Sequence, residues 1–213
     1  MIDPNKSRKL SLYFKIVTSD TDREKIKLFL NANVSQNLRQ STSLFDDTGI
    51  VAVLFEELEV IGVAKISFSK DIVLQNSELY DFERFEKLYP GRVAFLTKPI
   101  IKSDHRWESR FLLFMKEIYK IIRTAGMEVT VVEGGEAAGD FKEIGFHHYR
   151  YGSGDSQLKS VQPMVMYNRD EPYFEIIDSP LHELCCSFNK LEKLAKIEKN
   201  VRTIRSPLFR HFA

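Results

Sequence analysis

Residues 92–146 constrain the fold more than any other stretch of the chain. The stretch begins with an apolar run at residues 93–96, passes through a polar turn at residues 102–106, and continues with apolar side chains at helical spacing. Gly126 ends the helical pattern, and residues 127–132 follow as a β-branched strand. A strand, a helix and a second strand joined this closely predict a right-handed βαβ unit with parallel strands. The helix N-terminus then lies beside the carboxyl end of the first strand, where its backbone amides favour an anion.

The rest of the chain adds elements on both sides of this unit. Gly62 lies inside one predicted strand, which indicates a bulge or a close backbone approach, and Pro163 indicates an edge position or a late beginning of another. Further strands are predicted at residues 10–17, 49–58, 60–68, 147–151 and 161–167. Further helices are predicted at residues 21–31, 79–88 and 178–199, with a polar loop over residues 31–47.

Composition limits the function classes. The chain has 213 residues, of which 43% are hydrophobic, so it is long enough for one α/β or α+β domain with a real core. Its 31 basic and 30 acidic side chains leave a formal net charge of +1, which gives no overall field for a nucleic acid or a membrane surface. Arginines in the tail (Arg202, Arg205 and Arg210) do not change this balance, so no nucleic-acid partner is expected.

Neither the start of the chain nor any later run has the apolar length of a signal core or of a membrane span. A cytoplasmic protein without an integral membrane segment is therefore the expectation. Cys185 and Cys186 are adjacent and rarely bridge each other in such a position, so we expect reduced thiols that pack as small apolar groups.

The C-terminal region predicts an extension of the domain. Residues 178–199 begin with Asp178 or Ser179 as a cap and carry Pro180 in the first turn. Leucines follow at helical spacing on one side of this helix (Leu181, Leu184, Leu191 and Leu194). The expected organisation is a domain over residues 1–170 and a helical extension over residues 171–213, which packs on the domain or on a second subunit of a homodimer.

The order of these elements resembles the GNAT acyltransferase superfamily. The hairpin with Gly62 is similar to the family's second and third strands, and residues 98–125 resemble the strand and helix that hold the pantetheine and pyrophosphate of acyl-CoA. The segment FKEIGFHHY is similar to the family's Tyr-x-x-x-Gly-Phe ending, with Phe141 in place of the Tyr. The insertion LYDFERFEKLYPGR and the ending VQPMVMY resemble the N-acyl amino acid synthase and acyl-homoserine-lactone synthase branch. The resemblance covers residues 10–168.

This resemblance implies an acyl-CoA N-acyltransferase fold, a mixed central sheet flanked by helices. It also implies transfer of an acyl group from acyl-CoA, or from acyl-phosphopantetheine on an acyl-carrier protein, to a small amine such as an amino acid, without a metal. The alternative is a catalytically degenerate binding or regulatory protein. Two departures favour the alternative. Phe141 replaces the Tyr, and the phosphate loop lacks the glycines of the family. If the loop motif begins at Arg106, Ser109 and Phe111 stand at the glycine positions, and if it begins at Lys102, His105 and Trp107 stand there.

The resemblance and the chemistry together give the candidate site residues. Residues of the polar turn and of the first helical turn are expected to bind the donor; the alternative is a solvated basic turn. These residues are Lys102, His105, Arg106, Trp107, Ser109 and Arg110. Glu133 is placed to accept the amine proton through a water, or is a surface residue at a strand end. His147 is a candidate base or a polar group satisfied within the fold, and Tyr149, or Tyr151, is a candidate donor of the proton to the leaving thiolate. The expected acceptor side consists of Asp46, Asp47, Phe95 and Lys98, with a turn before the hairpin as the alternative role of the two aspartates.

Overall fold

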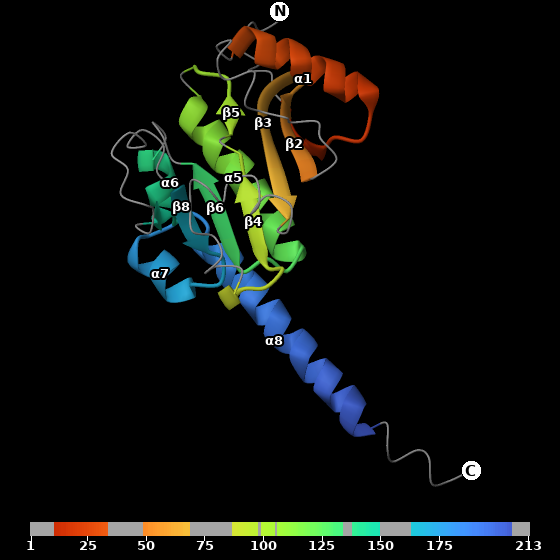
Figure 1. Cartoon of the computed structure of the whole chain (residues 1–213), viewed down its shortest axis with the longest axis vertical. Helices are drawn as coiled ribbons and strands as arrows, with labels where there is room; N and C mark the ends of the chain where they lie inside the picture. Colours follow the sequence, from red (N-terminus) through yellow and green to blue (C-terminus); the bar gives the residue numbers. More distant parts are fainter. Residues whose placement is uncertain are drawn as a thin grey trace, which may run out of the picture.

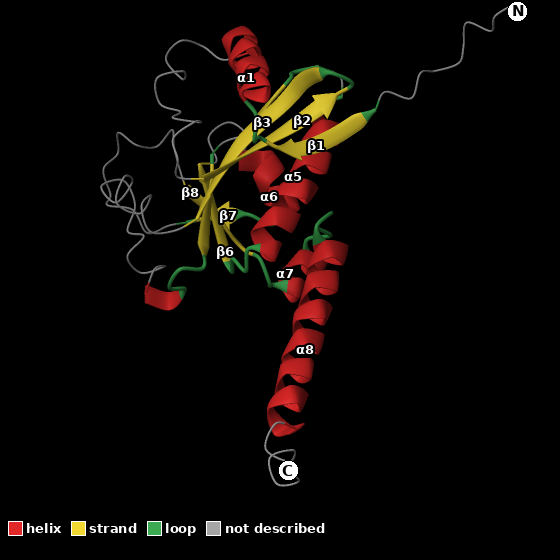
Figure 2. Ribbon diagram, turned by 90° about the vertical axis from the view of Figure 1, so that its right-hand side faces the viewer, coloured by secondary structure: helices red, strands yellow, loops and turns green. Residues whose placement is uncertain are grey.

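A mixed β-sheet with helices on both faces forms the body of the protein (Figures 1 and 2). The structure is a computed structural model that describes residues 11–33, 49–68, 87–97, 99–104, 106–133, 138–149 and 163–205. The strands are β1 (Leu12–Ile16), β2 (Gly49–Glu56), β3 (Glu59–Phe68), β4 (Val93–Leu96), β5 (Ile100–Ile101), β6 (Val129–Glu133), β7 (His147–His148) and β8 (Pro163–Tyr167). The helices are α1 (Asp20–Asn33), α5 (Trp107–Thr124), α6 (Ala138–Ile144), α7 (Glu171–Ile176) and α8 (His182–Arg205).

The sheet order is β1-β2-β3-β4-β6-β8-β7, with β5 paired to β3. The pair β4–β6 is parallel and α5 connects its strands, which confirms the βαβ prediction. The pairs on either side are antiparallel, so the sheet is mixed as expected. The predicted hairpin is β2–β3, and its register shifts between Leu54 and Phe55, opposite Gly62. A Cβ on Gly62 would lie 3.3 Å from the Leu54 Cβ, so the glycine allows a close approach at the bulge.

Three apolar clusters fill the two faces of the sheet. Alternate residues of each strand point to opposite faces. On one face, α5 packs its apolar side on β2, β3, β4, β6 and β8 in the largest cluster, which includes Tyr119 and Phe141. On the other face, α1 covers β2 and β3 through Ile26 and Phe29. A third cluster lies on that second face at β4, β6 and β8 and includes Phe95. Figure 2 shows the sheet edge-on between α1 and α5.

Several boundaries differ from the sequence prediction. Residues 31–33 continue α1 rather than beginning the polar loop. β8 lies between β6 and β7, so Pro163 is not on an edge strand, and residues 161–162 of the predicted strand lie outside the described part. Only residues 87–88 of the predicted helix at 79–88 are described, and they are helical. Of the strand predicted at 147–151, residues 147–148 form β7 and residues 150–151 lie outside the described part.

The C-terminal helix begins later than the predicted start at residue 178. A separate helix, α7, precedes it, and α8 begins at His182 because residues 177–181 form a turn in which Asp178 has a φ of 53°. Phe174, Leu181 and Cys185 belong to the main core, so the first part of the predicted extension packs on the domain. Leu191 and Leu194 are 62% and 50% exposed on the part of α8 that projects away from the sheet (Figure 1). No helix within the described residues has the length and apolarity needed to cross a membrane.

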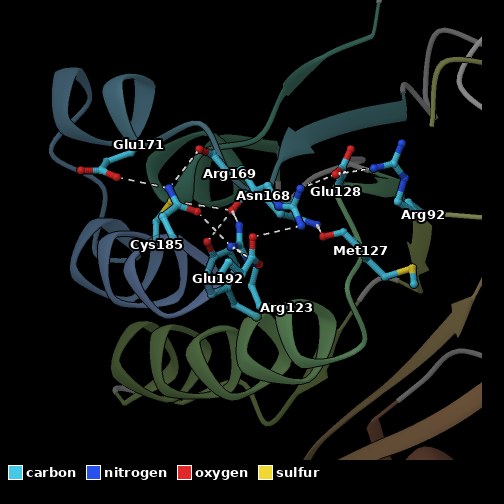
Figure 3. A network of polar contacts seen from close by, with 11 residues as sticks. Arg92, Arg123, Met127, Glu128, Asn168, Arg169, Glu171, Cys185 and Glu192 are labelled. Atoms are coloured by element: carbon cyan, nitrogen blue, oxygen red, sulfur yellow. Dashed lines mark hydrogen bonds and ion pairs between the residues drawn. The ribbon is translucent and has the colours of Figure 1, made fainter. Parts of the chain in front are cut away.

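A buried polar network fastens α8 to the sheet (Figure 3). The Asn168 side chain donates to the Met127 carbonyl at 3.1 Å and accepts from the Thr130 hydroxyl at 2.8 Å. The Asn168 carbonyl accepts from the Tyr119 hydroxyl at 2.6 Å and also from Arg123. Tyr119 is therefore a core residue, as expected, and its burial raises the pKa of its hydroxyl.

Candidate functional site

The sheet divides beyond Leu96. Up to that residue β4 pairs with β3 on one side and with β6 on the other. After Leu96 the chain pairs with β3 a second time, as β5, where Ile101 is opposite Gly62. On the other side, β6 pairs with β4 only as far as Val132 within the described residues. Strands that separate leave backbone donors and acceptors on their facing edges, and an extended ligand can pair with such groups. We call this place, between β5 and the end of β6, the strand split.

The first turn of α5 follows β5 and is built around ion pairs. Arg106 donates to both oxygens of Glu56, at 2.6 and 2.9 Å. Arg110 donates to Glu56 at 2.7 Å and to Asp104 at 2.6 Å, and its side chain is only 1% exposed. Two guanidinium groups thus face two carboxylates, so this turn is neither a free phosphate grip nor a solvated basic turn. The arginines hold α5 against the end of β2.

Asp104 has a second role at this turn. Its carboxylate accepts from the backbone amide of Arg106 at 2.8 Å. That hydrogen bond, followed by the one from Arg110, holds the pKa of Asp104 below its ordinary value. No side chain of the described residues caps the amides of α5 itself. The Trp107 amide donates to the Asp104 carbonyl at 3.0 Å, so the helix dipole and the amides after Trp107 are what this turn has to attract an anion.

The other predicted donor-binding residues lie around this turn. Lys102 is exposed and is 3.6 Å from Glu59, which is itself exposed. Trp107 stacks on Phe111 with a centroid distance of 5.1 Å and packs against the main core. Ser109 donates its hydroxyl to the Arg106 carbonyl at 3.0 Å. His105 lies outside the described residues. Lys102 is thus the cation of this set that solvent reaches most freely.

The predicted catalytic residues lie on or beside two strands, β6 and β7, which both pair with β8. Glu133 is the last residue of β6 and pairs with Pro163 of β8. Tyr149 follows β7 and donates its amide to the carbonyl of the same Pro163 at 2.9 Å. Because neighbouring strands lie about 4.8 Å apart, the backbones of Glu133 and Tyr149 are roughly 10 Å from each other. Tyr149 packs against the cluster that contains Phe95, so Tyr149 and Phe95, both predicted site residues, lie on the same face of the sheet.

His147 lies further from the strand split, on the edge strand. Its ring contacts those of Tyr167 and Tyr173, with centroids 5.4 and 5.7 Å away. Its Nδ1 is buried and has no hydrogen-bond partner among the described residues. Burial lowers the pKa of His147, which keeps the imidazole neutral near pH 7. The predicted substrate residues Asp46, Asp47 and Lys98 lie outside the described residues.

Lys65 is a candidate that the sequence analysis missed. It lies in the middle of β3, is 4% exposed, and burial lowers the pKa of its ammonium group. Its amide donates to the Thr97 hydroxyl at 2.8 Å, and the Thr97 amide donates to its carbonyl at 2.9 Å. Thr97 is the residue directly after β4, so Lys65 lies beside the strand split. Strand alternation places Lys65 on the α1 face with Phe95, which is opposite Ser67 in the β3–β4 register.

This polar position separates two apolar clusters. On the α1 face, Val63 of β3 belongs to the cluster beneath α1, and Phe95 of β4 belongs to the neighbouring one. Lys65 and Ser67, both buried, lie between them on β3. The alternation Val63, Lys65, Ser67 is visible in the sequence. Because alternate residues of a strand share a face, it predicts that Lys65 and Ser67 form a polar strip on one face of β3.

Comparisons with known proteins show the fold. No protein-family model matches the sequence, and the curated proteins give no match. Solved structures do match. The chain is similar to FeeM, an N-acyl amino acid synthase from uncultured soil microbes, with a TM-score of 0.58, 8% identity, and coverage of 82% of this chain and 98% of that one.

Two further solved structures share the fold. An aminoglycoside 6'-acetyltransferase type Ii matches with a TM-score of 0.54, 7% identity and coverage of 73% and 97%. The acyl-homoserine-lactone (AHL) synthase LasI matches with a TM-score of 0.50, 10% identity and coverage of 75% and 91%. The chain therefore has the GNAT-like acyltransferase fold, as expected from its sequence.

Proposed function

We propose that the protein is an N-acyltransferase that moves an acyl group from a thioester donor to a small amine. The strand split beside the first turn of α5 is the observation that carries this proposal, because it offers an extended donor both backbone partners and a helix N-terminus. The shared fold supports it, since the similar structures include an N-acyl amino acid synthase and an aminoglycoside acetyltransferase.

The donor is acyl-CoA or acyl-phosphopantetheine on a carrier protein. We place its amide-containing arm along the strand split and its phosphates at the α5 amides and Lys102. Arg106 and Arg110 act indirectly, because their pairs with Glu56 and Asp104 fix the start of the helix. Trp107 supports this geometry by anchoring the first turn on Phe111.

The acceptor is an amine that also carries a carboxylate, as an amino acid does. Lys65 supplies a positive charge on the α1 face next to the strand split, where an acceptor meets the thioester. A buried ammonium group forms strong, charge-assisted hydrogen bonds with a carboxylate because little water competes for it. Phe95 provides an apolar wall on the same face.

The reaction needs two proton transfers. The amine nitrogen attacks the thioester carbonyl carbon, and the carbon–sulfur bond of the resulting tetrahedral oxyanion then breaks. We assign the amine proton to Glu133, through a water, and the proton of the departing thiolate to Tyr149. His147 is the alternative acid–base group, although its place on the edge strand is further from the strand split.

The second candidate function is a protein that binds the donor without catalysis. Neutralisation of Arg106 and Arg110 by Glu56 and Asp104 favours this alternative, because it removes two cations from the place where phosphates bind in the resembling family. Phe141 favours it as well, since it is fully buried in the main core.

Ligand-dependent melting followed by thiol release separates these functions. Acetyl-CoA, a long-chain acyl-CoA and free CoA are added to the full chain at about 100 times a micromolar Kd, where binding stabilises by about 2.7 kcal/mol and raises the Tm by roughly 5–10 °C. Binding by any of them, followed by thiol release with mixed amino acids, supports the transferase. Binding without release supports the binding protein. If none binds, an acyl-carrier-protein donor is tested for binding and for thiol release in the same way, and the absence of both rejects both functions.

Lys102→Ala and Arg106→Ala are expected to behave differently. Lys102→Ala should weaken CoA binding roughly fivefold, the effect of losing one exposed charge, and leave the Tm unchanged. Arg106→Ala should leave binding nearly unchanged and lower the Tm by about 3–6 °C, because Glu56 loses a bidentate partner. Isothermal titration and calorimetry measure the two quantities. A large loss of affinity in Arg106→Ala without a change in Tm would show that Arg106 leaves Glu56 to bind phosphate.

A further inference from the structure

We propose that Glu171, His182 and Cys186 form a binding site for a borderline-soft divalent cation, for which Zn²⁺ is the best match. A carboxylate oxygen, an imidazole nitrogen and a thiol sulfur from these residues all lie within 4.8 Å of one another. Zn²⁺ takes this mixture of ligands at about 2.0–2.3 Å, usually in a tetrahedron. Mg²⁺ and Ca²⁺ prefer oxygen ligands alone, so the sulfur and nitrogen argue against them.

The fold brings the three ligands together from two helices. His182 is the first residue of α8, and Cys186 lies one turn later on the same face of that helix. Glu171 is the first residue of α7, and the turn at Asp178 reverses the chain so that the two helices pack together. All three side chains are half-buried. Binding of the ion would bring these ligand atoms, which lie within 4.8 Å of one another, to the roughly 3.4 Å between ligands of a tetrahedral zinc ion, with a water as the fourth ligand.

An outer hydrogen bond orients the carboxylate. Asn189 donates to Glu171 Oε2 at 3.2 Å and accepts from Arg123 through its own Oδ1 at 2.9 Å. Metal-binding carboxylates commonly have such a partner, which fixes their orientation and strengthens binding. Figure 3 shows Glu171 at the margin of the buried polar network to which this bond connects it.

The cysteine pair supports the assignment. Cys185 is fully buried in the main core, as the sequence predicts for both thiols. Cys186 is not: it is half-buried, is not part of the main core, and its thiol lies near the Glu171 carboxylate. The expectation of two buried, apolar thiols is therefore wrong for Cys186, whose thiol lies with a carboxylate and an imidazole.

The position of the site indicates a structural role. Glu171 lies just beyond the end of β8, whose antiparallel pairing with β6 places this end beside Val129, opposite to the end with Glu133. A bound ion would join α7 to α8 far from the strand split. The proposal is thus independent of the acyltransferase function and departs from the resemblance, which implies no metal.

Cobalt spectroscopy on the full, tag-free chain tests the site. After chelator treatment, Co²⁺ should bind as one equivalent and produce a thiolate-to-cobalt charge-transfer band in the near ultraviolet, and Zn²⁺ should displace it. Zn²⁺ at about 100 times its Kd should raise the Tm by roughly 5–10 °C, and chelator should reverse the rise. Absence of the band, or more than one equivalent bound with equal affinity, would overturn the proposal.

Matched variants identify the ligands. Cys186→Ser should abolish the band, whereas Cys185→Ala should keep it even if its melting temperature falls. Glu171→Gln and His182→Ala should each weaken Co²⁺ binding by more than about tenfold. Glu183→Gln, which changes an exposed carboxylate in the first turn of α8, should change nothing. If Cys186→Ser does not fold, Glu171→Gln decides, and unchanged affinity in that variant would contradict the site.

Discussion

Arg123→Met is expected to lower the Tm by roughly 6–12 °C, the largest stability loss that we anticipate for a single substitution outside the strands. The Arg123 side chain is completely buried and joins three parts of the chain. It donates to the Asn168 carbonyl after β8, to Asn189 at 2.9 Å and to Glu192 at 2.8 Å on α8. Its guanidinium also lies 5.6 Å from the centre of the Phe188 ring.

The size of the effect follows from the burial of the ion pair. Removing one partner from a buried, hydrogen-bonded charge pair costs about 3–5 kcal/mol, because the groups left behind lose their bonds and regain little water. We expect the lower part of this range, since Glu192 is partly exposed and the Asn168 carbonyl keeps its bond from Tyr119. Methionine preserves much of the side-chain volume, so the measurement reports the polar network rather than a cavity.

Lys120→Met is the matched control on the same helix. Lys120 pairs with Glu117 at 2.6 Å, and both side chains are partly exposed. Such a pair contributes about 0.3–0.5 kcal/mol, so the control should shift the Tm by less than about 2 °C. Calorimetry on both variants and on the wild-type chain decides. If Arg123→Met melts as the control does, the network does not fasten α8 to the sheet.

The sequence predicts the parts of this fold that depend on local patterns. Helical spacing and Gly126 define α5, and apolar alternation defines the β2–β3 hairpin with its bulge near Gly62. Parallel pairing of β4 and β6 follows from a short strand–helix–strand connection. Each of these features is set by residues close in the chain, so a pattern of spacing is enough to find them.

Long-range pairing accounts for most of what the sequence did not reveal. Arg106 and Arg110 look like a phosphate grip in the sequence, but in the fold they pair with Glu56, which is far away in the chain, and with Asp104. The end of α8 carries leucines at helical spacing, yet Leu191 and Leu194 are exposed because α8 leaves the domain. Burial by a second subunit remains a prediction there.

A second class of omission concerns which face a residue occupies. Lys65 is one polar residue in a strand that reads as apolar, and Cys186 is one of two cysteines that read alike. The side on which each lies depends on register and helix phase. Lys65 shares the α1 face with Phe95, whereas half-buried Cys186 lies outside the main core that holds Cys185. The period of two in a strand and of 3.6 in a helix assigns each residue to a face, and these periods distinguish Lys65 and Cys186 from their neighbours.

Lys65→Met is expected to raise the KM for an amino-acid acceptor roughly 10- to 100-fold. A charge-assisted hydrogen bond contributes about 1.5–3 kcal/mol, which corresponds to a change of this size in affinity. Binding of the donor should change little, because its phosphates are assigned to the α5 amides and Lys102. Methionine keeps the length of the side chain, and calorimetry on this variant checks that it folds. Lys15→Met, on β1 and 42% exposed, is the control and should leave the acceptor KM unaltered.

Acceptor chemistry and pH separate a carboxylate-binding role of Lys65 from a merely structural one. The wild-type protein should prefer an amino acid over its amide by the same 10- to 100-fold, and Lys65→Met should lose that preference. Burial lowers the pKa of Lys65, so its charge is present below that pKa and is lost as the pH rises through it. As the pH rises, the preference for the acid over the amide should therefore be lost at a lower pH than the pH at which an exposed lysine loses its charge. Equal use of the acid and the amide by the wild-type protein would exclude Lys65 as the carboxylate partner, because its charge would then contribute nothing to acceptor recognition.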